Sequence, residues 1–263
     1  MTKPNILILH ASGINRDHEA AWACELAGGR PEIVHINQLR GAAPSHRLAD
    51  TQLLIVAGGF SYGDALGAGR RLALDLTLDL GDDLAAFVEA GKPILGICNG
   101  FQALVKAGLL PDPTPARNPV SSDPATTTLT HNGRGHFECR WVTLLPNPAS
   151  PCIFTRGLTE PIYCPVAHGE GRFISAAEVP DPQITLRYGG AAGQPAAGAY
   201  PANPNASTGD IAGVCSPNGT IMGLMPHPED HIVPWQHPRW TRGERGGLGL
   251  PLFEAGVRYA GEV

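Results

Sequence analysis

Three short apolar runs in the first hundred residues limit the possible folds more than any other feature of the chain. They occupy residues 5–9 (NILIL), 52–56 (QLLIV) and 93–97 (PILGI), and such runs are typical of strands buried on both faces of a parallel sheet. The segments between them have helical spacing. In residues 16–27 Trp22 and Leu26 lie four apart with alanines on the same side, which predicts an amphipathic helix.

Alternating strands and helices predict an α/β fold with a doubly wound, mostly parallel central sheet flanked by helices on both faces. In such sheets ligands bind at the carboxyl ends of the strands. Those ends are loops rich in glycine and small polar residues: 10–17 (HASGINRD), 57–64 (AGGFSYGD) and 98–102 (CNGFQ). We therefore expect three loops that are distant in sequence to share one crevice.

The second half of the chain predicts an additional antiparallel strand region. Residues 111–136 lack apolar periodicity and are interpreted as a long surface excursion. Strand-like runs follow, several of them expected to be antiparallel, at residues 139–145, 162–167, 184–188, 211–215 and 220–225. The glycine- and proline-rich stretch 189–209 is too brief for a domain linker, so we expect a single domain over residues 1–263.

Composition excludes several classes of function. A net charge of −5 provides no basic field for nucleic acid. No apolar stretch approaches the roughly 20 residues that span a bilayer, and we expect a cytoplasmic protein. Six scattered cysteines without a CxxC pair argue against a metal site or a disulfide framework. Neither GxxxxGK[ST] nor GxGxxG occurs, so we expect no cofactor in this chain.

Cys98 stands between Gly96 and Gly100, where the third apolar run turns abruptly into a helical pattern. Such a turn holds its central residue exposed in a strained conformation, with small neighbours making room. The positive end of the following helix favours thiolate over thiol. The pattern predicts a nucleophile; a buried cysteine in an ordinary turn is the alternative.

A candidate general base lies far downstream, in MPHPED. His227 and Glu229 are two residues apart, and in an extended segment this spacing puts both on one face, so that the carboxylate can orient the imidazole. Pro226 and Pro228 restrict the backbone around them. A polar, solvated loop is the alternative. The other histidines, including His10, His18, His131 and His237, are interpreted as surface or satisfied core residues.

Attack by a thiolate on an amide carbonyl requires N–H donors for the developing oxyanion. The loop after the second apolar run contains Gly58 and Gly59, and paired glycines let a backbone approach a ligand closely. The N–H groups of Gly59 and Asn99 are therefore the predicted oxyanion hole. A plain glycine turn is the alternative.

Together, AGGFSYGD, GICNGFQAL and GLMPHPED resemble the class I glutamine amidotransferases, whose Cys-His-Glu triad hydrolyses the amide of glutamine. The resemblance is closest to the glutaminase subunit of phosphoribosylformylglycinamidine synthase and extends through almost the whole chain, including HFECRWV, PVAHGEGRF and YPANPN. We expect no counterpart of GGFSYGD, PVAHGEGRF or YPANPN in amidotransferases of other pathways. His136 and the ending PEDH depart from the expected pattern.

The resemblance implies a flavodoxin-like amidotransferase fold, with Cys98 as nucleophile, His227 as acid/base, Glu229 as its orienter and Gln102 near bound glutamine. It also implies that ammonia passes to a large synthetase subunit, which uses ATP and Mg²⁺ to convert formylglycinamide ribonucleotide to formylglycinamidine ribonucleotide in purine biosynthesis. A small third subunit assists in some bacteria. Residues 63–71 and 234–240 (PWQHPRW) are candidate docking segments.

Three other functions remain open at this point. The chain could be an amidotransferase subunit for another acceptor, a related cysteine hydrolase, or a non-catalytic scaffold with the same fold. Release of glutamate would exclude the scaffold, and co-purification with a large ATP-binding synthetase would favour the amidotransferase of the purine pathway.

Overall fold

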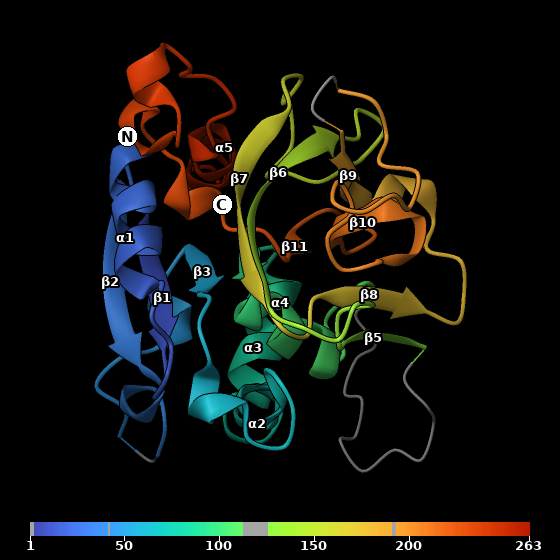
Figure 1. Ribbon diagram of the computed structural model, residues 1–263. Helices are drawn as coiled ribbons and strands as arrows, with labels where there is room; N and C mark the ends of the chain where they lie inside the picture. Colours follow the sequence, from blue (N-terminus) through green and yellow to red (C-terminus); the bar gives the residue numbers. More distant parts are fainter. Residues whose placement is uncertain (1–2, 42, 113–125, 191–192) are drawn as a thin grey trace.

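The computed structural model describes residues 3–41, 43–112, 126–190 and 193–263 (Figure 1). Its helices are α1 (Asp17–Leu26), α2 (Arg70–Leu74), α3 (Gly81–Glu89), α4 (Asn99–Lys106) and α5 (Leu250–Ala260). Its strands are β1 (Asn5–His10), β2 (Arg30–His35), β3 (Leu53–Val56), β4 (Ile94–Ile97), β5 (Thr127–Thr130), β6 (Glu138–Pro146), β7 (Ile162–His168), β8 (Arg172–Ser175), β9 (Ile184–Gly189), β10 (Ile211–Cys215) and β11 (Ile221–Leu224).

A nine-stranded sheet in the order β2-β1-β3-β4-β11-β10-β9-β6-β7 forms the centre of the molecule. The pairs from β2 to β11 are parallel, and those from β11 to β7 are antiparallel. β5 and β8 form a separate antiparallel pair. The predicted fold class, a mostly parallel core with an added antiparallel region, is confirmed.

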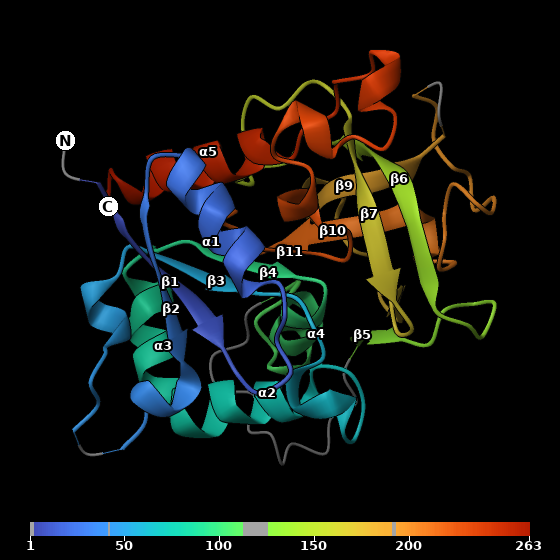
Figure 2. The same cartoon turned by 60° about the vertical axis from the view of Figure 1, so that its left-hand side comes forward.

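Helices cover both faces of the parallel part of the sheet. α1 and α5 pack together on one face, and α2, α3 and α4 lie on the other (Figure 2). This double cover explains why every residue of β3, β4 and β11 is buried, whereas burial alternates along the edge strand β7. None of the described helices has the length and apolar character needed to cross a membrane.

The predicted buried face of the first helix is wrong. α1 forms as expected, but Trp22 and Leu26 are exposed, and Ala20, Ala23 and Cys24 face the core. Small side chains allow the helix axis to approach β1 and β2 closely, while the bulky residues lie on the outer side.

Three strands (β2, β5 and β8) and two helices (α2 and α5) were not predicted from the sequence. β2 is an edge strand with only Val34 buried, so it lacks an apolar run. β5 lies within the region interpreted as a surface excursion, and it pairs with β8, which was not predicted either. The last helix, α5, was also not predicted. Residues 113–125 of that excursion lie outside the described residues.

Strand register brings the predicted site loops together. Val56 of β3 is level with Gly96 of β4, and Ile97 of β4 is level with Leu224 of β11. Since these three strands are parallel neighbours, the loops that carry Gly59, Cys98 and His227 leave the same edge of the sheet side by side.

Candidate active site

Cys98 lies between the end of β4 and the start of α4, in a conformation that side-chain-bearing residues rarely adopt. Its φ is 50° and its ψ −105°. The surrounding structure holds it there: its N–H donates to the carbonyl of Leu224 at 2.8 Å, and its carbonyl accepts from the N–H of Gln102 at 3.0 Å. Strain of this kind persists only where neighbours over-determine it, and it clusters at functional sites.

Close packing around this bend requires glycine. A Cβ at Gly100 would lie 1.8 Å from the carbonyl oxygen of Val56, and a Cβ at Gly96 would lie 2.5 Å from Leu104. A Cβ at Gly58 would lie 2.8 Å from Cε1 of His227 and 3.4 Å from Cβ of Cys98. Gly58 therefore lies against both side chains, which places the imidazole and the sulfur in one cleft.

His227 contacts Glu229 directly. Nδ1 of the imidazole lies 2.7 Å from Oε1 of the carboxylate, and both side chains are almost completely buried. The expected extended backbone is wrong: Glu229 lies in a 3₁₀ turn over Pro228–Asp230, and this turn folds its carboxylate back onto the ring. With Nδ1 bonded to Glu229, Nε2 is the nitrogen available to the thiol.

The environment of His227 favours the imidazolium. Burial alone would lower its pKa, but the charges of Glu229 and Cys98, together with hydrogen bonds to both, raise the pKa well above its ordinary value. A protonated imidazole beside a thiolate is the state needed for nucleophilic attack followed by proton donation.

A second buried histidine near His227 is held neutral. Burial, with the nearby charge of His227, lowers the pKa of His168 to about 3. Nδ1 of its ring lies 3.1 Å from Oδ1 of Asn132. Nδ2 of Asn132 donates to the backbone carbonyls of His168 and His136. His168 therefore forms a rigid, uncharged wall of the pocket.

The predicted oxyanion donors, Gly59 and Asn99, lie on the loops around Cys98. Ile14 and Gly59 are paired in an isolated antiparallel bridge. Its hydrogen bonds are donated by the N–H groups of Asn15 and Phe60, so this bridge does not use the N–H of Gly59. Asn99 is the first residue of α4, so its N–H has no partner within the helix. Both residues are adjacent to the cysteine loop.

The side chain of Asn99 ties the loops together. Its Oδ1 accepts from the N–H of Ser61 at 3.1 Å, and its Nδ2 donates to Asp64 and to Gln102. Gln102 in turn donates to the carbonyl of Glu170 at 2.7 Å. Gln102 thus supports the pocket wall, although its predicted contact with glutamine stays a prediction.

A cavity of about 190 Å³ opens beside Cys98. Its wall includes two carboxylates, Asp64 and Glu170, neither of which was predicted as a site residue. Asp64 also belongs to the predicted docking segment 63–71. His131, which we interpreted as a surface or core residue, also lines it. Burial and the charge of Glu170 raise the pKa of Asp64, while Asn99 and the charge of Lys106 act against this rise.

Metal-binding side chains do not gather in groups of three or more within the described ranges.

Comparison with known proteins identifies the family. The model of the CobB/CobQ-like glutamine amidotransferase domain matches residues 3–260. The chain belongs to the glutamine amidotransferase family. Two bacterial relatives, from Treponema denticola and Dehalococcoides mccartyi, are both phosphoribosylformylglycinamidine synthase subunit PurQ; each is 46% identical, with 98% and 100% of this chain covered and 99% and 100% of the relative.

Solved structures agree with this assignment. A chain in the structure of PurLQS from Thermotoga maritima is 31% identical and superposes with a TM-score of 0.73, over 98% of this amidotransferase and 99% of that chain. The resemblance to the PurQ glutaminase subunit of phosphoribosylformylglycinamidine synthase, an enzyme of purine biosynthesis, is confirmed. The roles of individual site residues stay predictions.

Asp230, next to the triad candidates, makes stability depend on pH. Burial and the charge of Glu229 raise its pKa from 3.8 to about 6. Between these values the native state binds more protons than the unfolded state, so the free energy of unfolding falls as pH rises. We expect Asp230→Asn to remove this loss. The free energy of unfolding of the variant minus that of the wild type should be about 1 to 2 kcal/mol larger at pH 7.5 than at pH 4.

Urea unfolding at both pH values measures this difference. Glu25→Gln, which removes an exposed carboxylate of α1, is the control and should follow the wild type. An equal effect of Asp230→Asn at pH 4 and pH 7.5 would contradict the raised pKa.

Proposed function

We propose that Cys98, His227 and Glu229 hydrolyse the side-chain amide of glutamine, and that the ammonia released serves a synthetase partner. The observation that carries this proposal is the cleft in which Cys98 and a buried, carboxylate-bound His227 both lie against Gly58. Family membership supports glutamine as the substrate.

The thiolate of Cys98 attacks the carboxamide carbon, and the N–H groups of Gly59 and Asn99 stabilise the oxyanion. His227 donates its proton to the leaving nitrogen, ammonia departs, and a γ-glutamyl thioester remains. His227 then takes a proton from water as the water attacks the thioester. Collapse of the second tetrahedral species returns the proton to sulfur and releases glutamate, while Glu229 stabilises each imidazolium that forms.

Asp64 and Glu170 are the groups we propose for the amino-acid end of glutamine. Both line the cavity beside Cys98, and Glu170 is oriented by the N–H of Ala68 and anchored through Gln102. An α-ammonium between them would offset the repulsion by Glu170, which together with burial raises the pKa of Asp64. The reacting amide would then lie toward the sulfur.

The partner we propose is a large ATP- and Mg²⁺-dependent synthetase subunit, with a small third subunit. The relatives named PurQ and the Thermotoga maritima PurLQS structure support this proposal. Ammonia released into water at neutral pH becomes ammonium and loses its nucleophilic lone pair. Direct contact between the two subunits avoids that loss.

Glutaminase activity should accordingly rise at least tenfold when the synthetase and formylglycinamide ribonucleotide are added. Glutamate release is measured for the chain alone, for the complex, and for the complex supplied with ammonium chloride in place of glutamine. Amidination with ammonium chloride should proceed without this chain. A chain that hydrolyses glutamine equally fast alone and in the complex would contradict the coupling, and one that never releases glutamate would contradict the function.

A further inference from the structure

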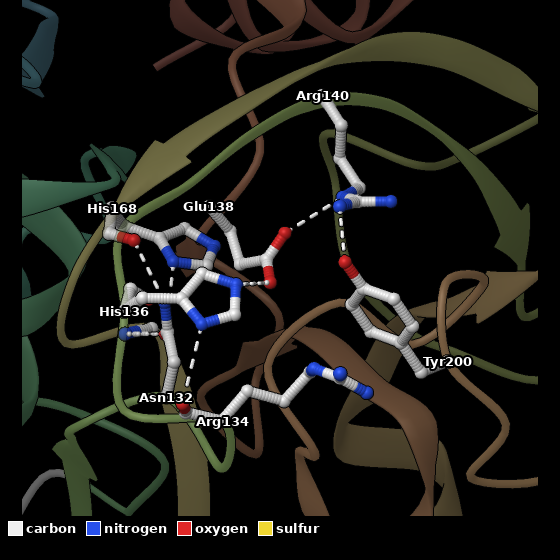
Figure 3. A network of polar contacts seen from close by, with 8 residues as sticks. Asn132, Arg134, His136, Glu138, Arg140, His168 and Tyr200 are labelled. Atoms are coloured by element: carbon white, nitrogen blue, oxygen red, sulfur yellow. Dashed lines mark hydrogen bonds and ion pairs between the residues drawn. The ribbon is translucent and has the colours of Figure 1, made fainter.

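Two arginines enclose an exposed tyrosine on the surface next to the glutamine pocket. Cζ of Arg134 lies 4.2 Å from the ring centroid of Tyr200, and Cζ of Arg140 lies 4.7 Å from it. Arg140 also donates to the tyrosine hydroxyl, as Figure 3 shows. These residues, with His136, are called the Tyr200 cluster below.

A buried carboxylate anchors the cluster. Glu138 is only 1% exposed, and its two oxygens face Nε of Arg140 at 2.7 Å and Nε2 of His136 at 2.9 Å (Figure 3). This neutralises one guanidinium. Arg134 is exposed, and no carboxylate of the described residues lies within 4.0 Å of it. The cluster thus presents an unneutralised cation on a chain whose net charge is −5.

The cluster is continuous with the wall of the pocket. Asn132 holds His168, which lines the cavity, and also donates to the carbonyl of His136. A protein bound at the cluster would therefore lie against a wall whose hydrogen bonds reach the glutamine site.

Two exposed aromatic side chains line the cavity, and one of them, Phe137, follows His136 of the cluster directly in the sequence. Phe137 and Phe60 are 48% and 41% exposed, their ring centroids are 6.3 Å apart, and both line the cavity. Aromatic residues and arginine are enriched in protein–protein interfaces relative to the rest of a protein surface. An occupant that covered them would also separate the pocket from water.

We propose that the Tyr200 cluster is a docking site for an acidic segment of the synthetase subunit. This inference rests on the proposed function, because it assumes that the synthetase is the partner. Charge complementarity favours a carboxylate-bearing occupant over an apolar one.

The test reverses the charge of Arg134. Arg134→Glu removes only a contact with the face of Tyr200, so this variant should fold normally. Substitution of Arg140 is avoided, because it would leave the buried Glu138 without its ion-pair partner. Arg156→Glu is the matched control, because Arg156 is exposed beside α5 in a hollow that shares no residue with the glutamine cavity. Titration of each labelled chain with the synthetase gives its dissociation constant.

We expect the dissociation constant to rise at least tenfold for Arg134→Glu and to stay within twofold of wild type for Arg156→Glu. Wild-type binding should weaken as salt is added, since salt screens exposed charges, and Arg134→Glu should be less sensitive to salt. Glutamate release by the unbound variant should match that of the unbound wild type.

The outcomes separate the docking site from the function. If wild type and Arg134→Glu bind the synthetase equally well, the docking site is wrong and the proposed function stands. If the wild type neither binds the synthetase nor supports glutamine-dependent amidination, the proposed function is wrong as well.

A photoreactive benzophenone amino acid in place of Arg134 identifies the occupant. We expect crosslinks to a segment of the synthetase rich in aspartate and glutamate, and crosslinks to a basic or apolar segment would overturn the proposal. Saturable binding of inorganic phosphate that Arg134→Glu abolishes, with synthetase affinity unchanged, would instead make the cluster a small-anion site and also overturn it.

Discussion

Cys98→Ser should lower the glutaminase turnover number by about 10⁴-fold or more. The serine hydroxyl fits the same bend, but its pKa is far higher than that of a thiol, and the imidazolium of His227 that stabilises a thiolate cannot remove its proton. Glutamate release in the presence of the synthetase measures the loss. Activity with ammonium chloride should remain, because that reaction bypasses this chain.

Cys139→Ser is the matched control, since Cys139 is an exposed free thiol on β6. It should keep wild-type turnover. A glutamine-like chloroketone should alkylate Cys98 and leave Cys139 unmodified, and glutamine should slow that labelling. Retention of more than a tenth of wild-type turnover by Cys98→Ser would remove Cys98 from the mechanism.

The parts of the site that could be predicted from sequence are those encoded by local pattern. A cysteine between glycines after an apolar run identifies a strand-to-helix turn, because the close packing of Val56 and Leu104 around the bend leaves no room for a Cβ at Gly100 or Gly96. The pair His227 and Glu229 was predicted from its spacing and from the flanking prolines, although the extended backbone assumed for it is wrong. Their approach to Cys98 depends on β11 lying parallel beside β4, so that both strands end at a common edge. The strand-like run 220–225 did not by itself predict that pairing.

The remaining features depend on contacts between distant segments. The packing of α1 was misjudged because the available space beside β1 and β2, rather than the size of Trp22, decides which side faces inward. Asp64 and Glu170 meet only because the turn after β3 lies beside the turn after β7. The Tyr200 cluster likewise joins residues about 60 positions apart, through a buried Glu138 that local pattern does not distinguish from a surface carboxylate.

Glu229→Gln should lower turnover by about 10² to 10⁴-fold, even though glutamine has the same shape. The carboxylate accepts the Nδ1 proton of His227 and so leaves Nε2 to the thiol. An amide can donate to Nδ1 instead, which favours the wrong tautomer. Loss of the negative charge also lowers the pKa of His227, because Glu229 is the strongest of the groups that raise it.

The pH profile distinguishes this role from a merely structural one. His227 must be protonated to release ammonia, so activity falls at alkaline pH when its proton is lost. The alkaline limb of kcat/KM should therefore shift to lower pH in Glu229→Gln. Asp230→Asn removes the adjacent carboxylate and is the matched control; its turnover should stay within about threefold of wild type. If the two variants lose equal activity, or if the alkaline limb stays in place, Glu229 does not orient and charge the histidine.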